Sequence, residues 1–166
     1  TTNIGIGGMP GEARESLDAL KAFIDKANEF AAYIAKSGFR FTYHNHSFEF
    51  RKFDGRTMLD YLVDGFDKDN ISFVLDTYWV QHGGGDVRAW MEKLAGRIDI
   101  LHLKDMGMSD KQYITEIGQG NINFDGIIET ADKIGVKYYV VEQDTCPGDP
   151  FESLKISRDY IAGRYM

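Results

Sequence analysis

Histidines and carboxylates stand at the ends of four apolar segments of this sequence. The first segment ends in Tyr43-His44-Asn45-His46, and the others end at Asp76, His102 and Glu142. Imidazole nitrogens and carboxylate oxygens bind divalent cations such as Mn, Co, Mg, Fe and Zn, and they also transfer protons. These residue types therefore indicate either a metal site or an acid–base site.

Each of these residues also has a simpler interpretation when it is taken alone. His102 on an apolar strand is more often a core histidine with satisfied hydrogen bonds, Asp76 can cap a loop, and Glu142 can pair with a lysine. Four strand ends that all carry ligand chemistry favour a shared site, because four separate coincidences would be needed otherwise.

The segments around these positions predict alternating strands and helices. Apolar spacing predicts a long helix over 10–38 and shorter helices near 57–66, 86–94, 124–134 and 149–161. Aromatic and β-branched runs predict strands over 39–44, 71–76, 98–104 and 136–142. A glycine-rich loop follows the second strand and a long loop follows the third. The first ten residues, which do not begin with methionine, are interpreted as a loop.

Four strand–helix units in succession predict an α/β fold with a parallel sheet, because each helical crossover returns the chain in the same direction. The carboxyl ends of parallel strands lie on one face, so residues roughly 25 to 40 positions apart can meet in one pocket. No linker divides the chain, and we interpret residues 1–166 as a single domain.

Composition limits the classes of partner. No apolar run approaches the roughly 18 residues of a membrane helix, so we expect no membrane contact. The net charge of −7 would repel a phosphate backbone, so we expect no nucleic-acid partner. Cys146 is the only cysteine, and the first residues do not show the charged and then apolar pattern of an export leader. Both features favour a cytoplasmic location.

Five segments resemble, in their order and spacing, the xylose isomerase-like family of (β/α) barrels: YHNHSFEF, VLDTYWVQHGGGD, LHLKD, EIGQGNINF and VVEQD. The family includes sugar phosphate isomerases and epimerases and inosose dehydratase. Its members form a TIM-type (β/α)8 barrel, so the resemblance implies that this chain supplies about the last four strand–helix units, the C-terminal half. Open sheet edges make a homo-oligomer or an N-terminal half the expected protein partner.

The resemblance also implies roles for the strand-end residues. One divalent metal ion (Mn, Co, Mg, Fe or Zn) is expected, with His44, Asp76, His102 and Glu142 as its ligands. Many members carry glutamate at the position of His44, and that glutamate forms a base–acid pair with the later one. Here Glu49 is expected to reach back from the loop in its place.

Further residues are expected to act on the substrate. Glu142 is the predicted base, with His46 or Glu49 returning a proton. Lys104 is predicted to neutralise an enediolate oxygen, although a solvated lysine at a strand end is an equal alternative. The resemblance implies that Trp79 faces the substrate, with core packing as its alternative. Gln119 and Asp144 are polar loop residues that are expected to contact substrate hydroxyls.

The predicted function is a metal-dependent isomerase or epimerase of a sugar or sugar phosphate. A proton alpha to a carbonyl is removed, and the metal stabilises the enediolate. A metal-dependent lyase acting on a keto-cyclitol or keto-sugar shares this step and is the first alternative, because the Tyr-His-X-His arrangement resembles that branch. Endonuclease chemistry at abasic sites is disfavoured by the acidic charge. A non-catalytic half-barrel fragment is the last alternative.

Overall fold

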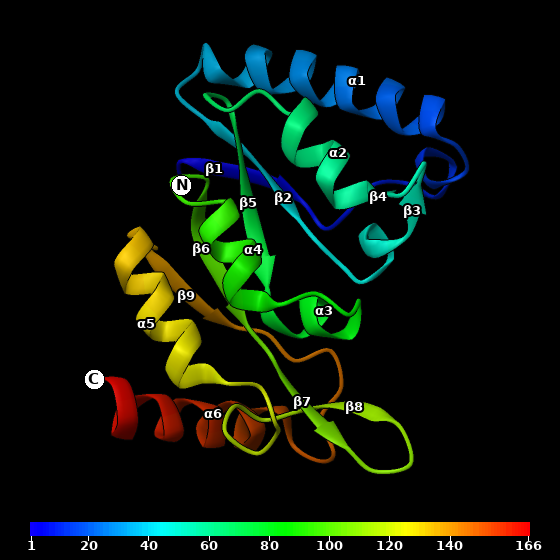
Figure 1. The fold of residues 1–166 in the computed structure, drawn as a ribbon. Helices are drawn as coiled ribbons and strands as arrows, with labels where there is room; N and C mark the ends of the chain where they lie inside the picture. Colours follow the sequence, from blue (N-terminus) through cyan, green and yellow to red (C-terminus); the bar gives the residue numbers. More distant parts are fainter.

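A five-stranded parallel sheet forms the centre of the computed structural model, which describes all 166 residues (Figure 1). The strands lie across the sheet in the order β1 (Asn3–Ile6), β2 (Arg40–His44), β5 (Ile71–Asp76), β6 (Ile98–Leu103) and β9 (Tyr138–Val141). Each strand pairs in parallel with the next one. The predicted parallel α/β sheet is confirmed.

Helices follow the strands of this sheet along the chain. They are α1 (Leu17–Ala35), α2 (Met58–Gly65), α3 (Thr77–His82), α4 (Val87–Lys93), α5 (Phe124–Ile134) and α6 (Pro150–Tyr165), with 3-10 turns η1 (Gly11–Arg14) and η2 (Phe48–Phe50). Figure 1 shows α1 and α2 at one end of the sheet and α5 and α6 at the other, with α4 between them. Parallel strands joined by covering helices are the architecture of part of a (β/α)8 barrel.

Local chemistry explains where the predicted helices begin and end. The Ser16 side chain accepts a hydrogen bond from the backbone N–H of Ala19 and caps α1. Asn123 caps α5 in the same way through Gly126, and α5 stops at Gly135, whose left-handed φ of 78° favours glycine. The apolar face of α1 is buried through Leu20, Ile24, Ala27, Ala31 and Ile34.

The interpretation of the first ten residues as a loop is wrong. β1 pairs with β2 from Asn3 opposite Arg40 to Ile6 opposite Tyr43. The strand is only four residues long and is followed by glycines, so its pattern is weak. Gly5 is needed for the close approach of the two strands, because an added Cβ would lie 2.2 Å from Thr42 Oγ1. The chain therefore supplies five barrel strands.

One helix and two strand pairs were absent from the sequence prediction. Helix α3 starts directly after β5, although its residues Thr77 to Val80 are strand-forming types, because Asp76 caps it. The long loop after β6 contains an antiparallel hairpin of β7 (Asp105–Met108) and β8 (Gln112–Thr115). A second small pair, β3 (Lys52–Phe53) and β4 (Arg56–Thr57), precedes α2.

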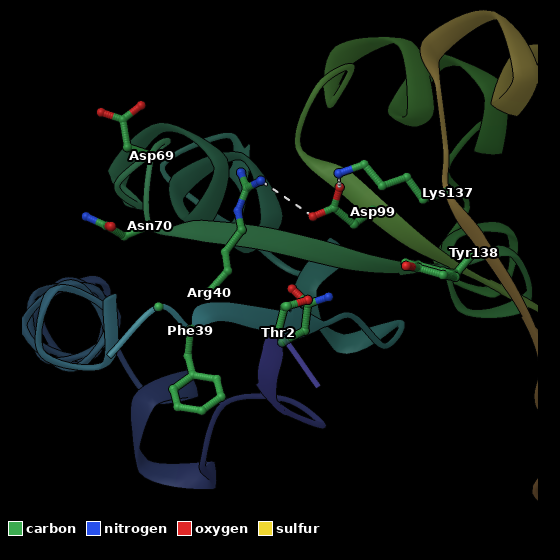
Figure 2. A pocket seen from close by; sticks show the side chains of 10 residues that line it. Thr2, Phe39, Arg40, Asp69, Asn70, Asp99, Lys137 and Tyr138 are labelled. Carbon is green, nitrogen blue, oxygen red and sulfur yellow. Dashed lines mark hydrogen bonds and ion pairs between the residues drawn. The ribbon is translucent and has the colours of Figure 1, made fainter. Parts of the chain in front are cut away.

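The amino ends of the strands hold a polar cavity of about 290 Å³, shown in Figure 2. Asp99 of β6 pairs there with Arg40 of β2 at 3.5 Å and with Lys137 at 2.8 Å. In (β/α) barrels this end serves stability, whereas chemistry occurs at the carboxyl ends of the strands. We therefore assign these ion pairs to the fold.

Both edges of the sheet are open, because β1 and β9 each have a single neighbour. Tyr138, Tyr139 and Val140 of β9 are exposed. The hydrophobic core is one cluster of 31 buried residues. No helix of the protein has the length and apolar character needed to cross a membrane.

Candidate metal centre

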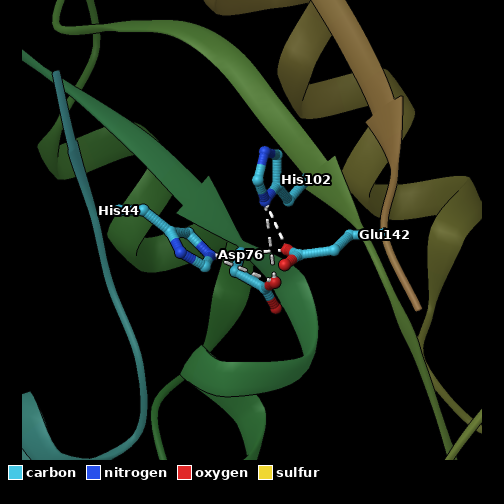
Figure 3. Close-up of side chains that lie close together, drawn as sticks. All are labelled: His44, Asp76, His102 and Glu142. Atoms are coloured by element: carbon cyan, nitrogen blue, oxygen red, sulfur yellow. Dashed lines mark hydrogen bonds and ion pairs between the residues drawn. The ribbon is translucent and has the colours of Figure 1, made fainter. Parts of the chain in front are cut away.

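Four side chains converge at the carboxyl ends of the strands, as Figure 3 shows. They are His44 of β2, Asp76 of β5, His102 of β6 and Glu142, which follows β9. One nitrogen or oxygen atom of each lies within 4.8 Å of those of the other three. The parallel strands thus bring together residues that are far apart in the sequence.

The separations within this cluster suit a shared cation. His44 Nε2 lies 3.4 Å from Asp76 Oδ2 and 3.5 Å from Glu142 Oε2. His102 Nδ1 lies 2.5 Å from Glu142 Oε2 and 4.0 Å from Asp76 Oδ2. Bonds of about 2.0–2.2 Å to one ion place its ligand atoms roughly 3 to 4 Å apart. Two imidazoles and two carboxylates therefore fit a divalent ion with small adjustments.

Asp76 has two tasks, one for each oxygen. Oδ1 accepts a hydrogen bond of 2.9 Å from the backbone N–H of Trp79 and caps α3. Oδ2 faces His44 and His102. The backbone N–H of Asp76 donates to Asn45 Oδ1 at 3.0 Å, which fixes β5 to the segment after β2. The cap and the ligand interpretations of Asp76 are therefore compatible.

The two carboxylates differ in their electrostatic surroundings. Burial raises the pKa of Asp76, although hydrogen bonding to His44 and the charge of Lys104 oppose this. Burial would also raise the pKa of Glu142, but hydrogen bonds to His102 and Asp76 outweigh it and lower the pKa to about 2. Glu142 is therefore ionised at neutral pH, and its side chain is 30% exposed.

Lys104 brings a positive charge to the cluster. Its ammonium Nζ lies 2.7 Å from Asp144 Oδ2, 3.7 Å from Asp76 Oδ2 and 3.8 Å from Glu142 Oε2. The side chain is fully buried, so the alternative of a solvated lysine at a strand end is wrong. The ammonium is positioned to stabilise negative charge that develops beside the carboxylates.

His46 and Trp79 form an aromatic wall next to the cluster. The His46 ring lies between those of His44, at 4.8 Å, and Phe48, at 5.5 Å, and its centroid is 5.3 Å from Trp79. Trp79 Nε1 and His46 Nδ1 are buried without a hydrogen-bond partner. Burial, His44 and Lys104 lower the pKa of His46 to about 4, so its imidazole is neutral at pH 7. Trp79 also packs against the core.

Glu49 lies apart from this cluster. It is fully buried. Its Oε1 accepts a hydrogen bond of 2.6 Å from the Tyr43 hydroxyl, and its Oε2 accepts one of 2.9 Å from the backbone N–H of His46. The Tyr43 hydroxyl in turn accepts from the backbone N–H of Met9. Both oxygens of Glu49 are occupied, one by Tyr43 of β2 and the other by the backbone of His46 just after β2, so the structure does not bring it to the metal ligands.

The buried carboxyl group of Glu49 is expected to make the stability of the fold depend on pH. Burial raises its pKa from 4.5 to about 7. Because the folded state holds this proton more tightly, stability falls as pH rises from about 4.5 to 7, by about 3 kcal/mol. In urea unfolding, the free energy of unfolding of the wild type minus that of Glu49→Gln should therefore be about 2–3 kcal/mol larger at pH 5 than at pH 8. The exposed Glu12→Gln serves as the control, and an equal difference at both pH values would contradict the prediction.

Gln119 is exposed in the loop before α5, and its side chain makes no hydrogen bond. Asp105 holds that loop. Its Oδ1 accepts from the backbone N–H groups of Met106 and Ile122, and Oδ2 accepts from those of Gly118 and Gly120. A Cβ at Gly120 would lie 2.4 Å from Asp105 Oδ1, which explains the second glycine of GQG. Sequence reasoning did not identify Asp105.

Comparisons with known proteins agree with this fold. A family model described as xylose isomerase-like TIM barrel matches residues 2–161. Inosose dehydratase of Geobacillus thermodenitrificans (strain NG80-2) is 27% identical over 157 residues, which cover 83% of this chain and 52% of that protein. The chain therefore spans about half the length of this curated relative.

Solved structures share the fold. A sugar phosphate isomerase/epimerase from Parabacteroides distasonis ATCC 8503 is 28% identical, with a TM-score of 0.86 over 99% of this chain and 58% of its own. The IOLI protein with a bound zinc atom is 15% identical, with a TM-score of 0.67 over 97% of this chain and 62% of its own, and it shows the fold alone. The match over nearly the whole sequence shows that this chain belongs to the xylose isomerase-like TIM barrel family.

Proposed function

We propose that this chain carries the metal-binding part of a divalent-metal-dependent enzyme that isomerises or epimerises a sugar or sugar phosphate. The convergence of four ligand atoms within 4.8 Å at the carboxyl ends of the strands is the observation that carries the proposal. Similarity to a sugar phosphate isomerase/epimerase supports the substrate class. Isomerisation and epimerisation would share one step, the removal of a proton alpha to a carbonyl.

His44, Asp76, His102 and Glu142 would hold the ion, and Mn, Co, Mg, Fe and Zn all accept such ligands. A zinc atom in the related IOLI structure supports a divalent metal. A bound divalent cation supplies Lewis acidity that stabilises the negative charge of an enediolate.

Glu142 and the side chains around the ligands would carry out proton transfer, charge stabilisation and substrate binding. Glu142 is ionised and half-buried, and it takes the proton from carbon. The Lys104 ammonium stabilises the developing oxyanion. The neutral His46 gives its ring N–H proton to the enediolate and regains a proton, through solvent water, from the protonated Glu142. The unpaired Nε1 of Trp79 donates to a substrate hydroxyl. Asp144, whose side chain is 42% exposed, binds another hydroxyl.

A dehydratase is the second candidate. Similarity to inosose dehydratase favours it, and so does His44 at a position where the epimerase resemblance implies glutamate. A lyase uses the same proton abstraction and then expels a β-hydroxyl, which needs a proton donor on the side of His46. The two reactions differ only after the enediolate has formed.

Solvent exchange tests the shared step. The protein, loaded with Mn²⁺ or Zn²⁺, is incubated in D2O with a panel of keto-sugars, keto-sugar phosphates and keto-cyclitols. We expect deuterium to be incorporated at the alpha carbon, and we expect no incorporation after a chelator has removed the metal. An exchanged epimer or isomer supports the first candidate, and a dehydrated product supports the second. A metal-loaded protein that exchanges nothing would contradict both and leave a non-catalytic half-barrel.

A further inference from the structure

Lys104 is a buried positive charge in contact with the proposed ligand oxygens. Its Nζ lies 3.7 Å from Asp76 Oδ2 and 3.8 Å from Glu142 Oε2. A divalent cation held by these two oxygens would experience the ammonium at short range. The repulsion between like charges a few ångströms apart is large even at the effective dielectric constant of a protein site, roughly 20.

The ammonium has little freedom to move away. The Thr77 hydroxyl accepts a hydrogen bond of 3.0 Å from the backbone N–H of Lys104 and donates one of 2.8 Å to its carbonyl. Thr77 is itself fully buried at the start of α3. The Lys104 Nζ lies 5.0 Å from the centre of the Trp79 ring, which covers it on one side. The backbone and the side chain of Lys104 are both held in place.

Asp144 supplies the compensating negative charge. Its Oδ2 makes the closest contact of the ammonium, at 2.7 Å, and it comes from the loop after β9. Asp144 is not one of the four clustered ligand residues. Its position suits neutralisation of Lys104 and not coordination.

We propose that Lys104 and Asp144 form a charge pair that sets the affinity of the cluster for its divalent cation. Lys104 weakens cation binding, and Asp144 strengthens it by cancelling the charge of Lys104. The inference rests on the proposed metal site and adds to it two residues that act without coordinating the ion. It predicts effects of opposite sign for the two halves of one ion pair.

A double-mutant cycle measures this coupling. The dissociation constant for Zn²⁺ is determined by competition with a chelating indicator at fixed pH and ionic strength, for the wild-type chain, Lys104→Met, Asp144→Asn and the double variant. Lys104→Met should bind Zn²⁺ about tenfold tighter, and Asp144→Asn about tenfold weaker. In the double variant the two opposite effects should nearly cancel, so that it binds Zn²⁺ within about twofold of the wild type.

A second ion pair provides the matched control. Lys137 and Asp99, 2.8 Å apart, join the same strands β6 and β9 at their amino ends (Figure 2). Lys137→Met and Asp99→Asn should leave the dissociation constant unchanged. Circular dichroism checks folding, and Lys104→Gln replaces Lys104→Met if that variant does not fold.

Three results would overturn the charge pair. Effects of equal sign in the two single variants indicate disturbed packing. Changes below twofold in both indicate no coupling. A double variant that binds Zn²⁺ about tenfold more weakly than the wild type indicates that Asp144 coordinates the ion directly. A wild type that binds no divalent cation is a different failure, because it removes the proposed metal site itself.

Discussion

Replacing Glu142 by glutamine is expected to slow deuterium exchange at the alpha carbon of the substrate by about 10² to 10⁴. The amide keeps the size and one oxygen of the side chain but cannot accept the proton. The lowered pKa of about 2 keeps the wild-type carboxylate ionised across the usual assay range, so the loss should not depend on pH between 5 and 8. Mass spectrometry of the recovered sugar measures the exchange.

The metal content separates this loss from the loss of the ion. His102→Ala removes an imidazole ligand candidate and should lower the bound metal per protein, with exchange falling in proportion. Glu142→Gln should retain more metal than His102→Ala at a saturating concentration and yet remain inactive. Wild-type exchange in metal-loaded Glu142→Gln would assign the base to another residue.

Asp105→Asn is expected to cost about 2–5 kcal/mol of unfolding free energy. The buried carboxylate accepts four backbone N–H bonds, two at each oxygen. An amide offers a single oxygen and turns its NH2 group toward two of these donors. Urea unfolding followed by circular dichroism measures the loss.

Asp110→Asn is the control for this variant, because Asp110 is exposed in the turn between β7 and β8. It makes the same chemical change where no backbone donor depends on the carboxylate, and we expect a change below about 0.5 kcal/mol. A similarly small change in Asp105→Asn would show that the loop before α5 does not rely on its carboxylate.

The convergence of the four strand-end residues followed from rules that sequence patterns express. Buried strands of six residues such as β5 are continuous apolar runs, and parallel strands end on one face. His44, Asp76 and His102 could therefore be assigned to one pocket once the strands were recognised. Their roles as metal ligands stay predictions.

The residues that sequence reasoning missed make their hydrogen bonds to backbone groups of other residues. Asp105 accepts from four backbone N–H groups, and Thr77 bonds the backbone of Lys104. Any residue type offers such groups, so no spacing in the sequence marks them. For Glu49 the residue type suggested chemistry, but the sequence did not reveal that Tyr43 and the His46 backbone occupy its oxygens.

Asp76 shows how the proposed metal site would be lost during evolution. Asparagine caps a helix as well as aspartate does, so Asp76→Asn preserves the start of α3 while removing the negative charge from the cluster. Glutamate keeps the charge but is a poor cap. A gene duplicate released from selection for catalysis can therefore accept asparagine here at little folding cost, and asparagine at position 76 would mark descendants that retain the fold without its chemistry.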